Sequence, residues 1–436
     1  GLRLLKGVKE KGFKTAGWDF LDDYIEIQQK RAKGKTDESP VYIKDLVAGR
    51  PVFGHPGRSG GFRYRYGRGR VSGFSAASLH PATMAITDDF IAIGTQLKIE
   101  KPTKGCVISV CDQIDGPIVK LFNGDVKKVN TLEEAREIYP DVEEIIYLGD
   151  ILFPFSDLAN RNYNMILPGY VEEWWWLQLK EKDSEFAKKV DYFNVDFDQV
   201  IEISQKYKIP LHPKFIFYWT EISNEQFFEL VDWVKHSRIV SKKVIFPYNK
   251  SEKEKFSIGK RVLELIGVEH KVTVENVVLS EENTAALLTN LGIDLNVLEK
   301  ENVLLTAFLD KKRFLLTDKT PLQIINSVST FEIKNKAGDF IGTRMGRPEK
   351  AKLRKLAGSP NILFPVGKEG GRLRSVQTAC EEGKVRAQFP LNFCKKCNKE
   401  TIYSICEKCG TESEKMYYFS DTRDKYFHKK IKGKEK

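Results

Sequence analysis

The sequence has 436 residues, which is too long for one ordinary hydrophobic core and predicts two to four domains. Hydrophobic residues make up 41% of it and aromatic residues 11%, a composition typical of globular rather than disordered chains. The formal net charge of +11 favours polyanionic partners. Apolar runs fall short of the ~20 residues that span a bilayer, and lysines near the N-terminus break any signal-peptide pattern. We therefore expect a soluble, intracellular protein.

The first part of the chain predicts β structure after a short helical start. A helical pattern over residues 18–30 and a polar linker form a first segment, residues 1–40. Short strand patterns separated by turns then predict a β-rich first part of a barrel or sandwich core over residues 41–178. The expected strands occupy residues 90–97, 106–111 and 117–122.

Two short-range signals fall within this β-rich part. Residues 123–125 read Asn-Gly-Asp, which predicts a tight turn between two strands. A short helix is expected over residues 131–139, begun by a capping box in which Thr131 and Glu134 satisfy each other's backbone N–H groups.

The rest of the chain changes character. Helical patterns with mixed charges predict an inserted α/β region over residues 179–330, with an apolar strand at 215–219. A basic second part of the core follows over residues 331–390, with a return to β structure near its start. We expect a zinc knuckle over 391–412 and a basic aromatic tail over 413–436. The helices expected in the insertion are 185–189, 197–208, 224–235, 253–265 and 281–291. The expected fold class is therefore α+β and multidomain, with a β-barrel core.

Two basic clusters lie far apart in the sequence and share one backbone chemistry. Glycines and prolines punctuate both, so the chain turns repeatedly and brings its N–H groups close to a ligand. Guanidinium forks and backbone N–H groups of this kind suit a phosphate chain. A solvated cationic loop is the alternative for either cluster alone. The cluster at 341–374 contains Arg344, Arg347, Lys350, Lys352, Arg354, Lys355, Lys368, Arg372 and Arg374, and the cluster at 49–70 contains Arg50, Arg58, Arg63, Arg65, Arg68 and Arg70.

The first cluster contains a strand signal. Residues 62–66 alternate between aromatic and arginine side chains, so the arginines share one face of a strand and the aromatic rings the other. Arginine recognises phosphate in a bidentate manner that lysine cannot reproduce. The two clusters together predict a nucleic-acid-binding protein.

The cysteines divide into a cluster and scattered thiols. Cys394, Cys397, Cys406 and Cys409 form two CxxC pairs separated by eight residues, while the other three cysteines lie apart. Two CxxC turns bring four thiolates to one tetrahedral Zn²⁺, which predicts a structural zinc knuckle with no open coordination position. An iron–sulfur cluster would use the same ligands, but no other feature suggests redox chemistry.

The histidines and tryptophans are weaker signals. Three of six histidines precede proline, and of these His55 lies inside the first basic cluster, where a structural role and a DNA contact are equally expected. Residues 174–176 are three consecutive tryptophans that cannot all face one core. A base-stacking platform needs basic groups beside the rings, whereas Glu172 and Glu173 precede them. We therefore expect two tryptophans to pack between domains and the third to lie on a surface.

Several longer motifs follow one another along the chain. They are GRPVFGHPGRSGGFRYRYGRGR (49–70), HPATM (80–84), YLGDILFPFSD (147–157), GYVEEWWW (169–176), IPLHP (209–213) and GTRMGRPEKAKLRK (342–355). In this order and at this length they resemble the large subunit of the archaeal family-D replicative DNA polymerase. The resemblance runs from about residue 17 to the last cysteine.

This resemblance implies a core of two double-psi β-barrels with attached zinc modules. One barrel supplies basic residues, here the expected role of this chain, and the other an acidic loop that binds two Mg²⁺ ions. In the family that loop lies downstream of the cysteine cluster, so the Mg²⁺ ligands are expected outside this chain. The start at Gly1 rather than Met predicts a fragment or one piece of a split protein.

The resemblance also implies roles for particular residues. Lys350, Lys352 and Lys355 are the expected catalytic residues, which would meet the nucleotide triphosphate or the primer–template backbone. The expected nucleic-acid-binding residues are His55, Arg58, Arg63, Arg65, Arg68, Arg70, Arg344, Arg347, Arg372 and Arg374. The arginines from 63 to 70 would follow the duplex.

The implied partners are primer–template DNA, dNTPs, the missing C-terminal part of the large subunit and a small subunit that holds the 3′–5′ exonuclease site. The location implied is the cytoplasm of a prokaryotic cell, at the nucleoid. This chain alone is expected to bind DNA without polymerising it.

One acidic segment resembles the metal-binding loop of two-barrel polymerases. Residues 194–199 read Asn-Val-Asp-Phe-Asp-Gln, but Gln199 stands in the place of a glycine and the third carboxylate is missing. We interpret the segment as the start of a helix, with acidic residues in its first turn.

Two alternatives remain open. A non-enzymatic, zinc-containing nucleic-acid-binding or assembly module would use the same arginines and knuckle. A part of an RNA polymerase would share the barrel architecture. The lysines separate a binder from a polymerase, because in a polymerase their neutralisation abolishes synthesis with little loss of DNA binding.

Overall fold

The computed structural model describes most of the central chain and parts of the C-terminal region. The described residues are 11–12, 40–67, 70–71, 74–101, 103, 105–154, 158, 166–300, 302–309, 319–346, 369, 376–384, 391–406, 408–418 and 426–427. The chain separates into two compact units, residues 1–348 and 349–436. The helix expected over 18–30 lies outside the described residues.

A ten-stranded mixed sheet organises the larger unit. Its strand order is β1-β2-β18-β6-β7-β5-β11-β3-β17, with β4 beside β5, and the pairs β5/β7 and β11/β3 are parallel. The strands are β1 (Asp45–Val47), β2 (Arg50–Gly54), β3 (Phe62–Tyr66), β4 (Arg70–Val71), β5 (Phe74–Leu79), β6 (Gln96–Ile99), β7 (Gly105–Val110), β11 (Asp150–Phe153), β17 (Phe340–Ile341) and β18 (Thr343–Met345). This order has two ends, β1 and β17, so the strands that the structure describes form no closed barrel.

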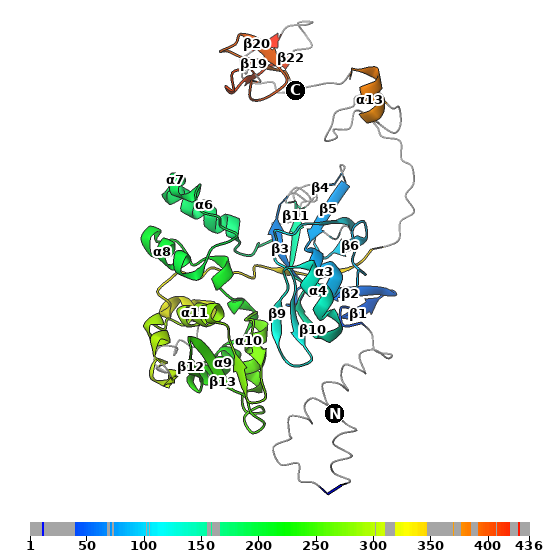
Figure 1. Ribbon diagram of the computed structural model, residues 1–436. Coiled ribbons are helices and arrows are strands. Elements are labelled where there is room, and N and C mark those ends of the chain that lie inside the picture. The colour runs from blue at the N-terminus through cyan, green and yellow to red at the C-terminus, as the bar shows by residue number, and fades with distance from the viewer. Residues whose placement is uncertain are drawn as a thin grey trace. The chain divides into compact units, whose positions relative to one another are not determined.

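A small sheet and two helices complete the β-rich part (Figure 1). The Asn-Gly-Asp turn joins a hairpin as predicted, and Gly124 adopts a φ of 91° there. Thr131 caps the following helix, accepting a hydrogen bond from the Glu134 N–H, but the Glu134 carboxylate contacts Lys127 instead of completing a capping box. The elements are β8 (Ile118–Leu121), β9 (Val126–Lys128), β10 (Val142–Tyr147), α3 (Pro81–Ile86), α4 (Leu132–Ile138) and the 3₁₀ turn η1 (Tyr139–Asp141).

Between β11 and β17 the chain builds a helical part around a five-stranded sheet. Its helices are α6 (Glu172–Lys182), α7 (Ser184–Ala187), α8 (Phe197–Tyr207), α9 (Asn224–Lys235), α10 (Ser257–Leu265), α11 (Glu281–Asn290) and α12 (Pro321–Val328), with 3₁₀ turns η2 (Pro213–Phe215), η3 (Trp219–Glu221), η4 (Leu295–Glu299) and η5 (Leu305–Ala307). The strands are β12 (Arg238–Val240), β13 (Lys243–Pro247), β14 (Lys271–Val272), β15 (Asn276–Val278) and β16 (Val303–Leu304).

Local sequence signals account for these helices. Ser223 and Gln226 form a full capping box at α9, and Asp196 caps α8 through the Gln199 N–H at 2.7 Å. The helical prediction for the acidic segment at 194–199 is thus confirmed. The strand predicted at 215–219 is wrong, because its backbone bonds to the Asn290 side chain and the Ile266 carbonyl rather than to a neighbouring strand. The strand predicted at 90–97 is mostly a turn, and β6 begins only at Gln96.

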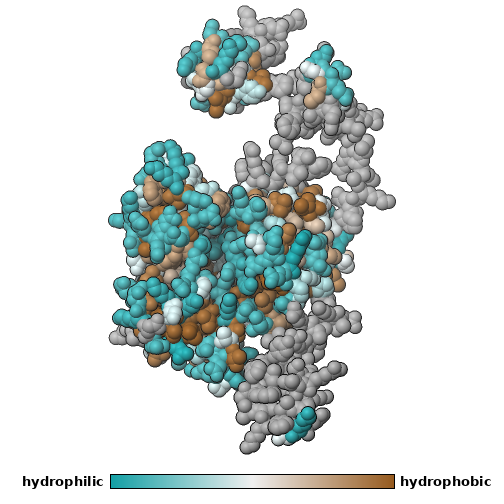
Figure 2. Space-filling view, viewed as in Figure 1, coloured by the Kyte–Doolittle hydropathy of each residue, from teal (hydrophilic) through white to brown (hydrophobic). Residues whose placement is uncertain are grey.

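Each part of the larger unit has its own hydrophobic core. A third cluster, which includes Tyr147, Tyr218 and Phe340, joins the β-rich part to the helical part. Hydrophilic residues cover most of the face drawn in Figure 2, with hydrophobic residues in separate patches. The described helices include none that is long and apolar enough to cross a membrane.

The described elements combine helices with several sheets, so the predicted α+β class is confirmed.

The described residues of the smaller unit form one helix and short strands. Helix α13 is Val376–Glu382, and a three-stranded sheet pairs β19 (Asn392–Cys394) with β20 (Lys399–Thr401) and β21 (Glu414–Lys415). A hairpin of β22 (Tyr417–Tyr418) and β23 (Tyr426–Phe427) follows.

Candidate functional site

The two arginines of β3 are buried and ion-paired. Only 1% of Arg63 and 3% of Arg65 is exposed. Arg63 holds Asp150 in a bidentate pair at 2.5 and 2.8 Å, and Arg65 donates to the same carboxylate at 3.0 Å. Arg65 also donates to Glu172, at 3.0 Å, and to Glu173.

These ion pairs assign the two arginines to the interior. Burial alone lowers the pKa of each guanidinium, but the surrounding carboxylates outweigh burial and raise both pKa values above the ordinary one. Both groups are therefore charged and fully engaged with acids. The expectation that Arg63 and Arg65 follow a DNA duplex finds no support in this placement, because the acids occupy the guanidinium forks that would hold phosphate.

The buried charges extend toward the helical part. Asp115 contacts Arg63 at 3.0 Å and Lys128 at 2.6 Å, and these cations hold the pKa of Asp115 below its ordinary value despite burial. Lys336 donates to the Ile216 carbonyl at 3.0 Å. Burial, together with repulsion from Lys128, lowers the pKa of Lys336 to about 7.

The predicted split of two enclosed tryptophans and one exposed is confirmed on α6, but the two enclosed rings pack within the core of the helical part and not between domains. Trp175 is fully buried, and its indole N–H donates to the Pro210 carbonyl. Trp176 packs against the core and donates to the Ala187 carbonyl, while Trp174 remains 42% exposed. Glu172 and Glu173, which precede them, accept hydrogen bonds from Arg65, so α6 is joined to the sheet.

The two basic clusters meet where glycines let their backbones touch. A Cβ atom on Gly342, between β17 and β18, would lie 2.6 Å from backbone atoms of His55 and Pro56. A Cβ on Gly61 would lie 2.4 Å from the Ile341 carbonyl oxygen, and one on Gly54 would lie 2.8 Å from Gly61. Only glycine allows such an approach. Two motifs separated by most of the chain therefore form one surface.

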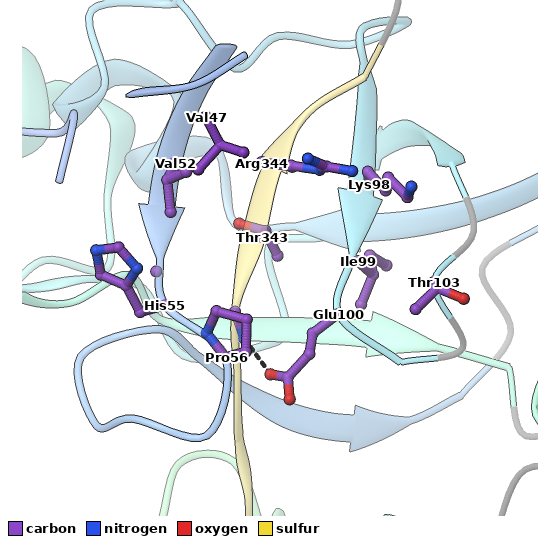
Figure 3. Close-up of a pocket in the computed structure, with 12 residues that line it drawn as sticks. Val47, Val52, His55, Pro56, Lys98, Ile99, Glu100, Thr103, Thr343 and Arg344 are labelled. Carbon is purple, nitrogen blue, oxygen red and sulfur yellow. Dashed lines mark hydrogen bonds between the residues drawn. The ribbon is translucent and has the colours of Figure 1, made fainter. Parts of the chain in front are cut away.

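A pocket of about 380 Å³ opens at this junction (Figure 3). Its walls are mostly aliphatic, from residues such as Val47, Val52 and Ile99. Thr343 lies at the centre of the labelled side chains; it is 3% exposed and its hydroxyl has no hydrogen-bond partner within the described part of the chain.

Cations surround this pocket. Arg344 of β18 lies directly opposite Lys98 of β6 in the strand register, and His55 lines the pocket too. Arg58 is exposed on the adjoining loop. The described residues form no ion pair with these four side chains, so the charges of Arg58, Lys98 and Arg344 are available to an anion.

Sequence reasoning missed several of these residues. Asp150 was detectable, because one acid inside an apolar strand pattern requires a buried partner. Lys98 and Glu100 share a strand face by alternation, but only the pairing of β6 with β18 brings them to Arg344.

Other predicted residues lie outside the described residues. These are Arg68, Arg347, Lys350, Lys352, Lys355, Arg372 and Arg374. The structure describes the backbone of Arg70, in β4, but not its side chain. His80 and His212, which also precede prolines, act as caps: each ring accepts a hydrogen bond from the N–H two residues on.

The four clustered cysteines converge in the smaller unit. All four sulfur atoms lie within 4.8 Å of one another, and the Cys394 and Cys409 sulfurs are 3.5 Å apart. A tetrahedral Zn²⁺ with bonds of about 2.3 Å places its sulfur ligands roughly 3.8 Å apart, so the group fits such an ion. Contacts with the Thr411 hydroxyl and N–H lower the pKa of Cys409 to about 6, which favours the thiolate a metal needs, whereas a hydrogen bond with Cys409 raises the pKa of Cys397 to about 12.

The fold and these sites define a class: an α+β protein with a basic surface site built from two distant motifs and a four-cysteine centre. Residues 29–426 match the family model described as DNA polymerase II large subunit DP2, central domain. The chain belongs to this family.

Curated relatives agree with this assignment. The chain is 37% identical to the DNA polymerase II large subunit of Nanoarchaeum equitans over 93% of its length, and 35% identical to that of Archaeoglobus fulgidus over 97%. It is 39% identical to the protein of the same name from Thermoplasma volcanium over 91% of its length. The chain spans 37%, 36% and 34% of these relatives, about a third of each.

Proposed function

We propose that this chain forms the central part of the large subunit of a DNA-directed DNA polymerase. The reaction is template-directed nucleotidyl transfer to a primer 3′-hydroxyl during replication. The observation that carries the proposal is the junction at Gly54, Gly61 and Gly342, which brings both basic clusters to one pocket. Arg344 in its wall and Arg58 on the adjoining loop have no ion pair with any described residue. The family membership supports the same conclusion.

In this proposal the surface cations hold phosphate. Arg58, Arg344 and Lys98 contact the backbone of the primer–template, and His55 adds a hydrogen bond. Beyond the described residues, Arg68, Arg70, Arg347, Arg372 and Arg374 extend the contact. Lys350, Lys352 and Lys355 are proposed to meet the triphosphate, where positive charge stabilises the transition state of an in-line displacement.

Metal ions divide between two roles. Mg²⁺, with ligands from an acidic loop outside these 436 residues, supplies activation of the 3′-hydroxyl and stabilisation of pyrophosphate. We propose a structural Zn²⁺ held by Cys394, Cys397, Cys406 and Cys409, since four ligands leave no position for substrate.

We also propose that the ten-stranded sheet, whose described strands do not close, forms part of one double-psi β-barrel of the polymerase core. Strands β17 and β18 follow one another through Gly342, yet β17 pairs with β3 near one end of the strand order and β18 pairs with β2 and β6 near the other. The continuous stretch from β17 to β18 thus pairs with strands near both ends of the strand order, as closure of a barrel requires.

The proposed partners follow from the role of the complete protein. They are primer–template DNA, dNTPs, the remaining part of the large subunit, and a small subunit that contributes 3′–5′ exonuclease activity to the heterodimer. The proposed location is the cytoplasm, at the nucleoid.

Primer extension with Mg²⁺ and dNTPs tests this function. The chain alone is compared with a mixture that adds the remaining large-subunit part and the small subunit. We expect synthesis in the mixture alone, lost when Lys350, Lys352 and Lys355 are replaced by Met while DNA binding persists. Robust extension by the isolated chain would refute the proposed division of the active site.

A second candidate function is a non-enzymatic DNA-binding or assembly module. The observation that favours it is that Glu100 is the one acid among the described residues that line the pocket, and its Oε2 atom already accepts two backbone N–H groups. For such a module, replacement of any cation weakens DNA binding to a similar, modest degree, and the reconstituted mixture synthesises no DNA.

A further inference from the structure

Glu100 joins the two basic clusters. Its Oε2 atom accepts hydrogen bonds from the N–H of Gly57 at 3.3 Å and from the N–H of Gly342 at 3.0 Å. Gly57 belongs to the loop that carries His55 and Arg58, and Gly342 directly precedes Thr343 and Arg344. One carboxylate oxygen therefore ties the loop of one cluster to the strand of the other.

The hold on Gly342 is reinforced by the backbone. The Glu100 N–H donates to the Gly342 carbonyl at 2.9 Å, so Gly342 is bound to Glu100 through both its donor and its acceptor. Gly342 is also the residue whose missing side chain lets the His55–Pro56 backbone pack against it. The position of the loop thus depends on the residue that Glu100 fixes.

We infer that Glu100 is a positioning residue of the nucleic-acid site: it holds Arg58 and Arg344 in one arrangement so that both reach the same strand of phosphates. This inference rests on the proposed function. It assigns to an acid the role of increasing DNA affinity, whereas simple electrostatics assigns it the opposite role, because a carboxylate near the binding surface repels phosphate.

The strand register supports a positioning role over a charge-pairing role. Lys98 lies in β6 and Glu100 directly follows this strand, yet the structure gives them no ion pair with each other within its described residues. Instead Lys98 faces Arg344 across the strands, an arrangement of like charges that is unfavourable without an anion. The Glu100 carboxylate accepts hydrogen bonds from the backbone and pairs with neither Lys98 nor Arg344, so both cations can bind the ligand.

Two substitutions of similar length separate charge from geometry. Glu100→Gln and Glu100→Met both remove the negative charge, but only Gln retains an oxygen that can accept the two N–H bonds. The affinity of the full chain for a fluorescent primer–template duplex is measured by anisotropy between 50 and 200 mM salt. We expect the Gln variant to bind as tightly as the unchanged chain or up to about threefold tighter, and the Met variant to bind roughly tenfold more weakly.

The salt dependence of DNA binding distinguishes the loss of particular phosphate contacts from a general loss of folded protein. Loss of one phosphate contact reduces the magnitude of the slope of log K against log salt by about 0.9. We expect the Met variant to lose one to two contacts, so its slope should become shallower by about one to two such steps. In addition, Arg58→Ala should weaken binding in the Gln background and have little effect in the Met background, where Arg58 is already misplaced. Glu137→Ala, an exposed glutamate on α4, serves as the control and should change affinity less than twofold.

The outcomes are distinct. Equal affinities for the Gln and Met variants would overturn the positioning role while leaving DNA binding intact. Failure of the unchanged chain to bind DNA would instead overturn the proposed function. Should the Met variant fail to fold in a thermal unfolding assay, Glu100→Asp replaces it: the charge is kept but the arm is shorter by one methylene. Positioning predicts weaker binding for the Asp variant than for the unchanged chain, and charge alone predicts equal affinity for these two proteins.

Discussion

Two sets of arginines from the basic clusters have opposite surroundings. Arg63 and Arg65 lie inside β3, where Asp150, Glu172 and their neighbours neutralise them. Arg58, on the loop just before, is exposed, Arg344 lines the pocket, and no described acid pairs with either. The first set fixes the architecture, since it ties the sheet to α6, and the second set is left for a ligand.

The difference shows that arginine content does not by itself identify a binding face. A buried guanidinium requires acids around it, because an unpaired buried charge is too costly. An exposed guanidinium that lacks an acid instead creates a positive surface potential. The role of each arginine is therefore decided by the acids around it, and these acids come from distant segments of the chain.

The largest effect should follow removal of the acid that both buried arginines share. Asp150→Asn leaves Arg63 and Arg65 without their common carboxylate and should lower the free energy of unfolding by about 3–5 kcal/mol. Chemical denaturation measures this loss. Asp112→Asn, an exposed acid nearby, should change the free energy by less than about 0.5 kcal/mol. A small effect at Asp150 would mean that the buried pairs do not stabilise the fold.

The buried network should also give stability a particular pH dependence. The pKa of Lys336 is lowered to about 7 in the folded chain, so between about pH 7 and 9 the unfolded chain binds a proton that the folded chain does not. Stability should therefore rise with pH in this window, by at most about 1.4 kcal/mol per unit from this group. The charged groups around Lys336 are Lys128, Asp115, Arg63 and Glu172.

Denaturation at several pH values in this window tests the assignment. Lys336→Met should flatten the rise relative to the unchanged chain, because Met carries no proton. Parallel curves for the two proteins would assign the dependence to another group.

The surface arginines should affect binding instead of stability. Arg58→Ala and Arg344→Ala should each weaken DNA binding by roughly three- to tenfold, and each should lower the salt slope by about one contact. Their unfolding free energies should change by less than about 0.5 kcal/mol. Arg65→Ala is the matched comparison, expected to destabilise the fold strongly. If Arg58→Ala destabilised the chain as Arg65→Ala does, the distinction between the two sets would fail.

The smallest effect concerns a buried polar group without a partner. Thr343→Val replaces the unpaired hydroxyl by a methyl group of the same shape and should leave stability unchanged or raise it by up to about 1 kcal/mol. Thermal unfolding measures this. A loss above about 1 kcal/mol would indicate that the hydroxyl has a hydrogen bond in the folded chain.

Features with a local cause were predictable from the sequence. The caps at Ser223 and Asp196, the Asn-Gly-Asp hairpin and the paired cysteines each act within a few residues of the chain. The division of the three tryptophans was also predictable, because their helical spacing and acidic neighbours already exclude one common face. The strand prediction for residues 215–219 was wrong, because hydrogen bonds with Asn290 and Ile266, which are remote in sequence, replace strand pairing there.

What the sequence by itself determined is therefore the helices expected between residues 185 and 291, the clustered cysteines and the presence of two basic clusters. Only the tertiary structure decided which of those basic residues are paired with acids and which are not. Arg63 meets Asp150 across 87 residues of chain, and Glu100 meets Gly342 across 242. The physical reason is that charge acts through space and burial, so the role of a charged side chain depends on neighbours that sequence proximity does not specify.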